Sequence, residues 1–168
     1  MSKSVAQTSQ DQDYSRVLVS LSSALSSEAL DKALTRSVRQ LRQSSDHFDW
    51  VGIYLLQESD LVLQTYAGDE ETDRTCWDTY RTGNMRSAAK EGATIVIPDV
   101  GKDPRYLMCF AATRSEIVVP IKGSKGMLGE IDIDSSRLSA FSENDRESLE
   151  EVASLLALYL ESKRFVSH

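Results

Sequence analysis

Apolar residues recur at helical spacing in three stretches of the chain. Residues that fall three or four positions apart form one face of an amphipathic helix. The first two stripes consist of Tyr14, Val17, Leu18, Leu21 and Leu25, and of Leu30, Leu34, Val38 and Leu41. Ser26 or Ser27 can cap the second helix, which we expect to end near Ser44. Residues 1–12 are rich in Ser, Gln and Asp, and we expect a disordered tail or a frayed helix start there.

The third apolar stripe lies near the C-terminus and is wide. It consists of Leu149, Val152, Ala153, Leu156, Tyr159 and Leu160. Ser142 and Asp145 precede it at the spacing of a capping box, in which each side chain bonds the other residue's backbone N–H. The pattern predicts a strong helix that begins at Ser142 and packs its stripe against another element.

Two strand-like segments follow the second helical stripe. Residues 48–56 form a nearly continuous apolar run, which is typical of a central strand covered on both faces. Residues 61–66 follow after a short turn, so we predict a hairpin that ends at Gly68. Alternation along the first strand places on one face Trp50, Gly52 and Tyr54.

A second hairpin is predicted from residues 116–121 and 127–134, joined by a Gly-containing turn. Strict alternation in the returning strand places on one face Leu128, Glu130, Asp132 and Asp134. The opposite face would carry Met127, Gly129, Ile131 and Ile133. Without further information, an acidic strand face of this kind is most simply a solvated surface.

The segment between the two hairpins has weaker patterns. Residues 69–84 are polar and aperiodic, which predicts a loop that carries Cys76. Residues 85–90 are expected to form a short helix, and residues 94–97 a short strand that Pro98 ends. A loop follows, with a helical turn near residues 105–108.

These elements predict an α+β fold with a central antiparallel sheet. The N- and C-terminal helices would pack on one face, and the long loops would lie over a ligand pocket on the other. A chain of 168 residues suits one domain, which we place at residues 13–164 with a short tail at 165–168.

The charge of the chain narrows its possible partners. The net charge is −7 and the isoelectric point is near 4.9, which disfavours nucleic acid and anionic lipid as partners. We find no apolar run long enough to span a membrane and no signal peptide, and we therefore expect a cytoplasmic protein. In that compartment two cysteines favour free thiols or a catalytic pair over a structural disulfide. His47 and His168 do not form a metal site with them, and we expect no metal and no cofactor.

A thiol stands close in sequence to the second hairpin. Cys109 precedes Glu116 by seven residues, and Asp132 and Asp134 follow on the paired strand. This combination suits a small cationic ligand beside a redox-active sulfur. Each residue also has a simpler explanation, since Cys109 can be a buried apolar residue and the acids can be solvated. We interpret Glu130 as a surface charge.

Several segments together resemble a GAF domain, and within that superfamily the free methionine-R-sulfoxide reductases. The resemblance covers about residues 14–162. The matching segments are FDWVGIYLL at 48–56, IPDVGKDPRYLMCF at 97–110, SEIVVPI at 115–121, and LGEIDIDSS at 128–136 followed by FSENDRESLE at 141–150. The resemblance implies a GAF fold and reduction of free L-methionine-R-sulfoxide.

The resemblance also implies roles for individual residues. Cys109 would be the nucleophile, and a family cysteine is replaced here by Met85, which leaves Cys76 as the candidate resolving thiol. Thioredoxin would be the reductant. The carboxylates that hold the substrate's amine would be Glu116, Asp132 and Asp134, and the aromatic wall of the pocket would be Trp50 and Tyr54.

Two other functions remain open at this point. The chain can be a non-catalytic GAF module that binds a small ligand and signals through a partner, or a degenerate relative with an empty pocket. The apolar stripes of the terminal helices also leave open the hypothesis of a homodimer.

Overall fold

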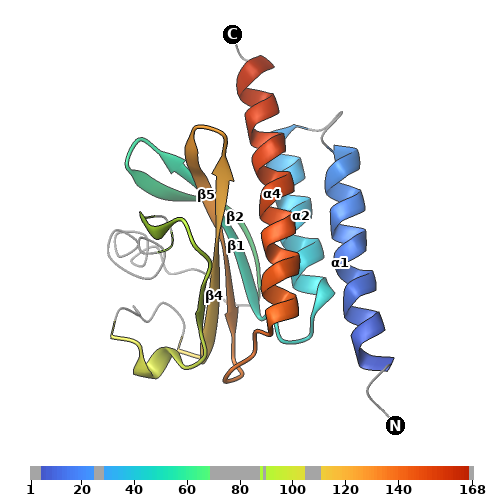
Figure 1. Ribbon diagram of the computed structural model, residues 1–168, viewed down its shortest axis with the longest axis vertical. Coiled ribbons are helices and arrows are strands. Elements are labelled where there is room, and N and C mark those ends of the chain that lie inside the picture. The colour runs from blue at the N-terminus through green and yellow to red at the C-terminus, as the bar shows by residue number, and fades with distance from the viewer. Residues whose placement is uncertain (1–4, 25–28, 69–87, 89, 105–110, 167–168) are drawn as a thin grey trace.

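The computed structural model describes residues 5–24, 29–68, 88, 90–104 and 111–166. In this part of the chain, an antiparallel sheet of five strands carries three long helices on one side (Figure 1). The α+β architecture and the placement of the terminal helices on one face are therefore confirmed. Among the described helices, none combines the length and the apolar character that a membrane span requires.

The helices form two layers on the sheet. Helices α2 (Leu30–Ser44) and α4 (Glu143–Val166) lie against the strands, and α1 (Val5–Ala24) packs on these two helices as an outer layer (Figure 1). Helix α1 begins nine residues before Tyr14, the first residue of its apolar stripe. The N-cap of α2 is Ala29, which has no side-chain oxygen, so the predicted serine cap is wrong.

The strand order in the sheet is β2-β1-β5-β4-β3, and every neighbouring pair is antiparallel. The strands are β1 (Trp50–Gln57), β2 (Asp60–Gly68), β3 (Ile95–Ile97), β4 (Ser115–Gly123) and β5 (Gly126–Ser135). Both predicted hairpins are present, and pairing of β1 with β5 joins them into one sheet. The acidic strand β5 therefore lies at the centre of the sheet and not at an edge.

The main core lies between the sheet and the helices. Its strand residues include Val51, Ile53, Ile117, Val119, Ile131 and Ile133, and its helix residues include Tyr14, Val17, Leu34, Val38, Leu41, Leu149, Val152 and Leu156. Each fully buried aliphatic side chain of this kind contributes about 1.5–3 kcal/mol relative to an exposed one. The predicted stripes and alternation thus correspond to the faces that are buried.

One residue of β5 departs from strict alternation. Leu128 was expected on the same face as Glu130, but it lies in the helix-side core. The pairing of β4 with β5 shifts between Ile121 and Lys122, so that Leu128 is an extra residue of a bulge. An extra residue reverses the alternation on one side of it, which explains the error.

Helix α4 begins with the predicted capping box. The Ser142 backbone N–H donates to Asp145 Oδ2 at 2.8 Å, and the Asp145 N–H donates to Ser142 Oγ at 3.1 Å. The Tyr14 hydroxyl of α1 also donates to Asp145 Oδ1, at 2.9 Å. His47, in the connection before β1, places Nε2 3.6 Å from Asp145 Oδ2. Asp145 therefore joins three separate segments of the helical side.

The middle of the chain is described only in part. Strand β3 agrees with the predicted strand, and a 3₁₀ turn at Val100–Lys102 follows it. Ala88 and Lys90 are helical, in agreement with the short helix predicted around them. The loop predicted at residues 69–84 and the turn predicted at 105–108 lie outside the described residues.

Candidate functional site

Four carboxyl side chains lie buried on the sheet face opposite the helices. Strand β5 contributes Glu130, Asp132 and Asp134, and β4 contributes Glu116. Their exposed fractions are 0%, 3%, 5% and 6%, respectively. The interpretation of Glu130 as a surface charge is therefore wrong, and Asp132 and Asp134 are not solvated residues of an open strand face.

The strand register places these acids in one compact group. Each acid of β5 has one neighbour on β1 and one on β4. Read from β1 through β5 to β4, the three rows are Trp50–Asp134–Glu116, Gly52–Asp132–Val118 and Tyr54–Glu130–Pro120. Directly opposite residues have Cβ atoms about 5 Å apart. Residues two apart on one strand are separated by about 7 Å. Four carboxyl groups thus share a space the size of a small molecule.

Asp132 lies in the middle of the group, and its environment opposes ionisation. Burial, followed by the negative charges of Asp134, Glu116 and Glu130, raises the pKa of Asp132 well above its ordinary value. Its Oδ1 atom is buried and accepts no hydrogen bond from any residue that the structure describes. Such a group can bind a cation or hold a proton for transfer, because either one relieves the repulsion among the carboxylates.

Aromatic rings stand beside the acids on β1. The rings of Trp50 and Tyr54 have centroids 6.5 Å apart, and both side chains are buried. The Trp50 ring lies over Gly52, where a Cβ atom would collide with it, so a glycine is required there. Tyr66 of β2 stacks on Trp50 with a centroid distance of 5.9 Å and an interplanar angle of 18°. The acids therefore have an apolar wall beside them.

Comparison with known proteins assigns the fold. The GAF domain family matches residues 29–160. The chain belongs to this family. A "GAF domain-containing protein A" of Dictyostelium discoideum is 29% identical over 153 residues, which are 90% of this GAF domain protein and 95% of that one.

Some relatives of this GAF domain carry the name of an enzyme. Free methionine-R-sulfoxide reductase of Saccharomyces cerevisiae is 36% identical over 112 residues, which cover 64% of this chain and 61% of the yeast protein. An X-ray structure of free methionine-R-sulfoxide reductase from Neisseria meningitidis, in complex with its substrate, is 30% identical with a TM-score of 0.78 and covers 91% of each chain. A putative GAF sensor protein from Burkholderia vietnamiensis has a TM-score of 0.79, with coverage of 92% of this chain and 98% of that one, but at 24% identity it shows likeness of fold alone.

The GAF fold brings together five of the residues that the sequence indicated. They are Trp50, Tyr54, Glu116, Asp132 and Asp134, and all five lie on one sheet face. The described residues do not include the two cysteines, Cys76 and Cys109. They also do not include Met85.

Two further residues of this face were missed in the sequence. Alternation already placed Glu130 beside Asp132, but the period-2 pattern of a buried strand and that of a solvated strand are the same. Tyr66 stands near the end of β2, opposite Gly52 on β1. Tyr66 reaches the Trp50 ring because the pairing of β1 with β2 shifts by one residue between Ile53 and Tyr54. The strand pattern alone did not predict this shift.

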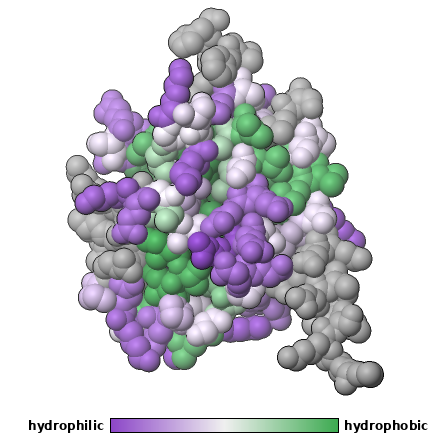
Figure 2. All heavy atoms as spheres, viewed as in Figure 1, coloured by the Kyte–Doolittle hydropathy of each residue, from purple (hydrophilic) through white to green (hydrophobic). Residues whose placement is uncertain are grey.

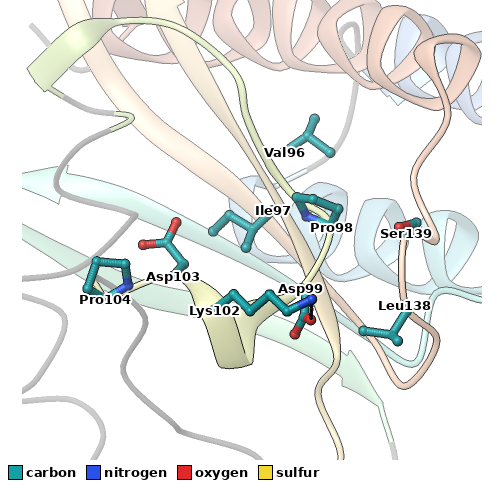
Figure 3. Close-up of a pocket in the computed structure, with 9 residues that line it drawn as sticks. All are labelled: Val96, Ile97, Pro98, Asp99, Lys102, Asp103, Pro104, Leu138 and Ser139. Carbon is teal, nitrogen blue, oxygen red and sulfur yellow. Dashed lines mark ion pairs between the residues drawn. The ribbon is translucent and has the colours of Figure 1, made fainter.

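A separate hollow of about 560 Å³ opens at the β3 edge of the GAF domain. Asp103 and Pro104 lie on one side of it, and Leu138 and Ser139 lie on the other (Figure 3). None of the four buried carboxyl groups lines it. Figure 2 shows one face of the molecule, on which apolar side chains gather in patches among polar ones. Within the described residues, no three His, Cys, Asp or Glu side chains are arranged to hold a metal ion.

Proposed function

We propose that this GAF domain reduces free L-methionine-R-sulfoxide to methionine. The observation that carries the proposal is the group of four buried carboxyl side chains beside the Trp50 and Tyr54 rings. Buried like charges are costly unless a ligand balances them. A free amino acid supplies an ammonium for the acids and, in this substrate, a short apolar side chain for the aromatic wall.

The proposed chemistry assigns a separate task to each group. Glu116, Asp132 and Asp134 hold the ammonium, while one carboxyl group of the set keeps a proton that is available to the sulfoxide oxygen. The Cys109 thiolate attacks the sulfoxide sulfur, and the oxygen passes to Cys109. Methionine sulfur is reduced by two electrons, and the thiol becomes a sulfenic acid.

Regeneration requires a second thiol. Cys76 condenses with the sulfenic acid to form a disulfide and release water, and thioredoxin then reduces the disulfide. Thioredoxin-dependent turnover suits a reducing compartment, and we therefore place the protein in the cytoplasm. Selectivity for the free amino acid follows from the acids, since a methionine residue within a peptide has no ammonium.

A homodimer is part of the proposal. Val19 on α1 and Leu158 on α4 are 69% and 59% exposed, so each terminal helix presents a large apolar side chain to solvent. A second copy of the chain would cover them. Light scattering at micromolar concentration measures the mass of the particle, and a monomeric mass would contradict this part.

The alternative is a GAF module that binds a small ligand without chemistry. It is favoured by Met85, which stands where the reductases that the chain resembles carry a cysteine. Both functions use the same acids and rings, so a binding measurement does not distinguish them. Reduction of the sulfoxide does, because only the enzyme performs it.

The deciding experiment follows the R epimer of free methionine sulfoxide by chiral chromatography, with dithiothreitol or with a thioredoxin system. We expect loss of the R epimer with both reductants and no loss in Cys109→Ser. The matched control is Cys76→Ser, which should retain a single turnover but lose thioredoxin-driven cycling. Absence of turnover with either reductant would leave the binding module as the function.

A further inference from the structure

We propose that Glu130 is a fourth carboxyl group of the ligand site, which makes the empty site retain a proton and release it when an ammonium binds. This inference rests on the proposed binding of a free amino acid but not on its reduction. It adds to the site a residue outside the three acids that the family resemblance indicated. It also predicts a property of binding that can be measured without any redox step.

The position of Glu130 gives it this role. The side chain is fully buried on the same face as Asp132, two residues away along β5. Its cross-strand neighbours are Tyr54 on β1 and Pro120 on β4, and its side chain has no exposure to solvent. A low effective dielectric strengthens the interaction between nearby charges, so Glu130 acts on Asp132 more strongly than an exposed acid would.

Three acids of the described chain act on Asp132 with the same sign. Asp134 and Glu130 flank it on β5, and Glu116 faces the group from β4. Their negative charges add to the effect of burial in raising the pKa of Asp132. Strand β1 contributes the neutral Tyr54 to the same face. The carboxyl groups titrate as a coupled set, and the set keeps a proton where a single exposed aspartate would have lost it.

An ammonium in the site reverses this balance. The positive charge stabilises the ionised form of the whole group, so the complex holds fewer protons than the empty site. By linkage, binding then releases protons and becomes tighter as pH rises through the range in which the empty site titrates. Neutralising Glu130 removes one of the repelling charges. The empty site would then bind fewer protons, so binding would release fewer and the affinity would depend less on pH.

Isothermal titration calorimetry with L-methionine, the product of the proposed reaction, tests this inference. Titrations near pH 7 in phosphate and in Tris measure proton release, because the two buffers have very different heats of ionisation. We expect release approaching about one proton per ligand in the wild type. In Glu130→Gln the release should fall by half or more. Glu151→Gln, which removes an exposed acid on α4, is the matched control and should release as many protons as the wild type.

A second variant and a second ligand serve as further controls. Glu130→Met serves as a second neutral variant of similar length, with circular dichroism to verify folding, and should show the same loss of release. The methionine analogue that lacks the amino group should release no proton. The inference would be overturned if the heat of binding to the wild type were the same in both buffers. It would also be overturned if both Glu130 variants released as many protons as the wild type. Proton release without any sulfoxide turnover would refute the proposed enzyme and leave the inference standing, whereas turnover without proton release would do the reverse.

Discussion

Two buried aspartates of this GAF domain have opposite surroundings. Asp145 is 1% exposed on the helical side, and Asp132 is 3% exposed on the opposite face of the sheet. Burial alone raises the pKa of both. At Asp145, the nearby His47 ring and hydrogen bonds from Ser142 and Tyr14 outweigh burial and lower its pKa, whereas at Asp132 the neighbouring acids raise the pKa further.

The difference separates a structural acid from the acid that we propose to bind the ligand. Asp145 caps α4 and links it to α1 through Tyr14. Its charge is stabilised within the fold, so ionisation strengthens the native state. Asp132 weakens the native state when it ionises. Among the described residues, none donates a hydrogen bond to its buried Oδ1 atom, and we expect a cationic ligand to balance the charge. Equal burial of the two aspartates therefore does not indicate their roles. The groups that surround each carboxylate do.

The largest expected effect comes from Asp145→Ala. The substitution removes the cap of α4 and leaves the buried Tyr14 hydroxyl without its acceptor. We expect the free energy of unfolding to fall by about 3 kcal/mol, the range for loss of a buried, multiply bonded carboxylate. Urea denaturation near pH 7 measures it.

Asp132→Ala is the matched variant on the other side of the sheet. It relieves repulsion among the acids, although it also leaves a small cavity. We therefore expect a change of less than about 1 kcal/mol, in either direction. Equal destabilisation by both variants would abolish the distinction between the two aspartates.

The next effect concerns ligand affinity. Asp132→Asn keeps the shape of the side chain but removes the ability to provide a negative charge. We expect L-methionine to bind about 10- to 100-fold more weakly, which corresponds to loss of one charge-assisted hydrogen bond. Calorimetry compares this variant with Asp31→Asn, an exposed position on α2 that should bind normally. Unchanged affinity in Asp132→Asn would place the ammonium elsewhere.

Much of this architecture could be predicted because local patterns determine it. The 3.6-residue stripes gave the helices, and alternation gave the two hairpins and the face shared by Trp50 and Tyr54. The capping box of Ser142 and Asp145 also follows from a spacing of three residues. In each of these elements, the relevant contacts are repeated at short intervals along the chain.

The errors arise where distant segments decide the outcome. Leu128 changed faces because of a bulge, and one extra residue in a strand is invisible in the pattern of a single strand. The burial of Glu130 depends on pairing of β5 with β1 as well as with β4, and only the pairing with β4 belongs to a predicted hairpin. Likewise, the partners of Asp145 come from residues 131 and 98 positions earlier in the sequence, namely Tyr14 and His47.

The smallest expected effect is a pH dependence of stability on the helical side. The Asp145 carboxylate, 3.6 Å from His47 Nε2, outweighs partial burial and raises the pKa of His47 in the folded protein. A group whose pKa is raised on folding stabilises the native state below its unfolded pKa, near 6.5, and this contribution is lost as pH rises through the folded pKa. His47→Gln should therefore lower the free energy of unfolding at pH 6 by no more than about 1 kcal/mol, and by less at pH 8.

Thermal or urea unfolding of the wild type and His47→Gln at several pH values between 5.5 and 8.5 measures this term. The difference between the two proteins should shrink steadily as pH rises, because the imidazolium loses its charge. Ligand affinity should stay the same, since His47 lies beside Phe48 and Asp145 on the helical side of the sheet, whereas the acids lie on its opposite face. A difference that is constant with pH would mean that His47 acts through ring packing on Phe48 and not through its charge on Asp145.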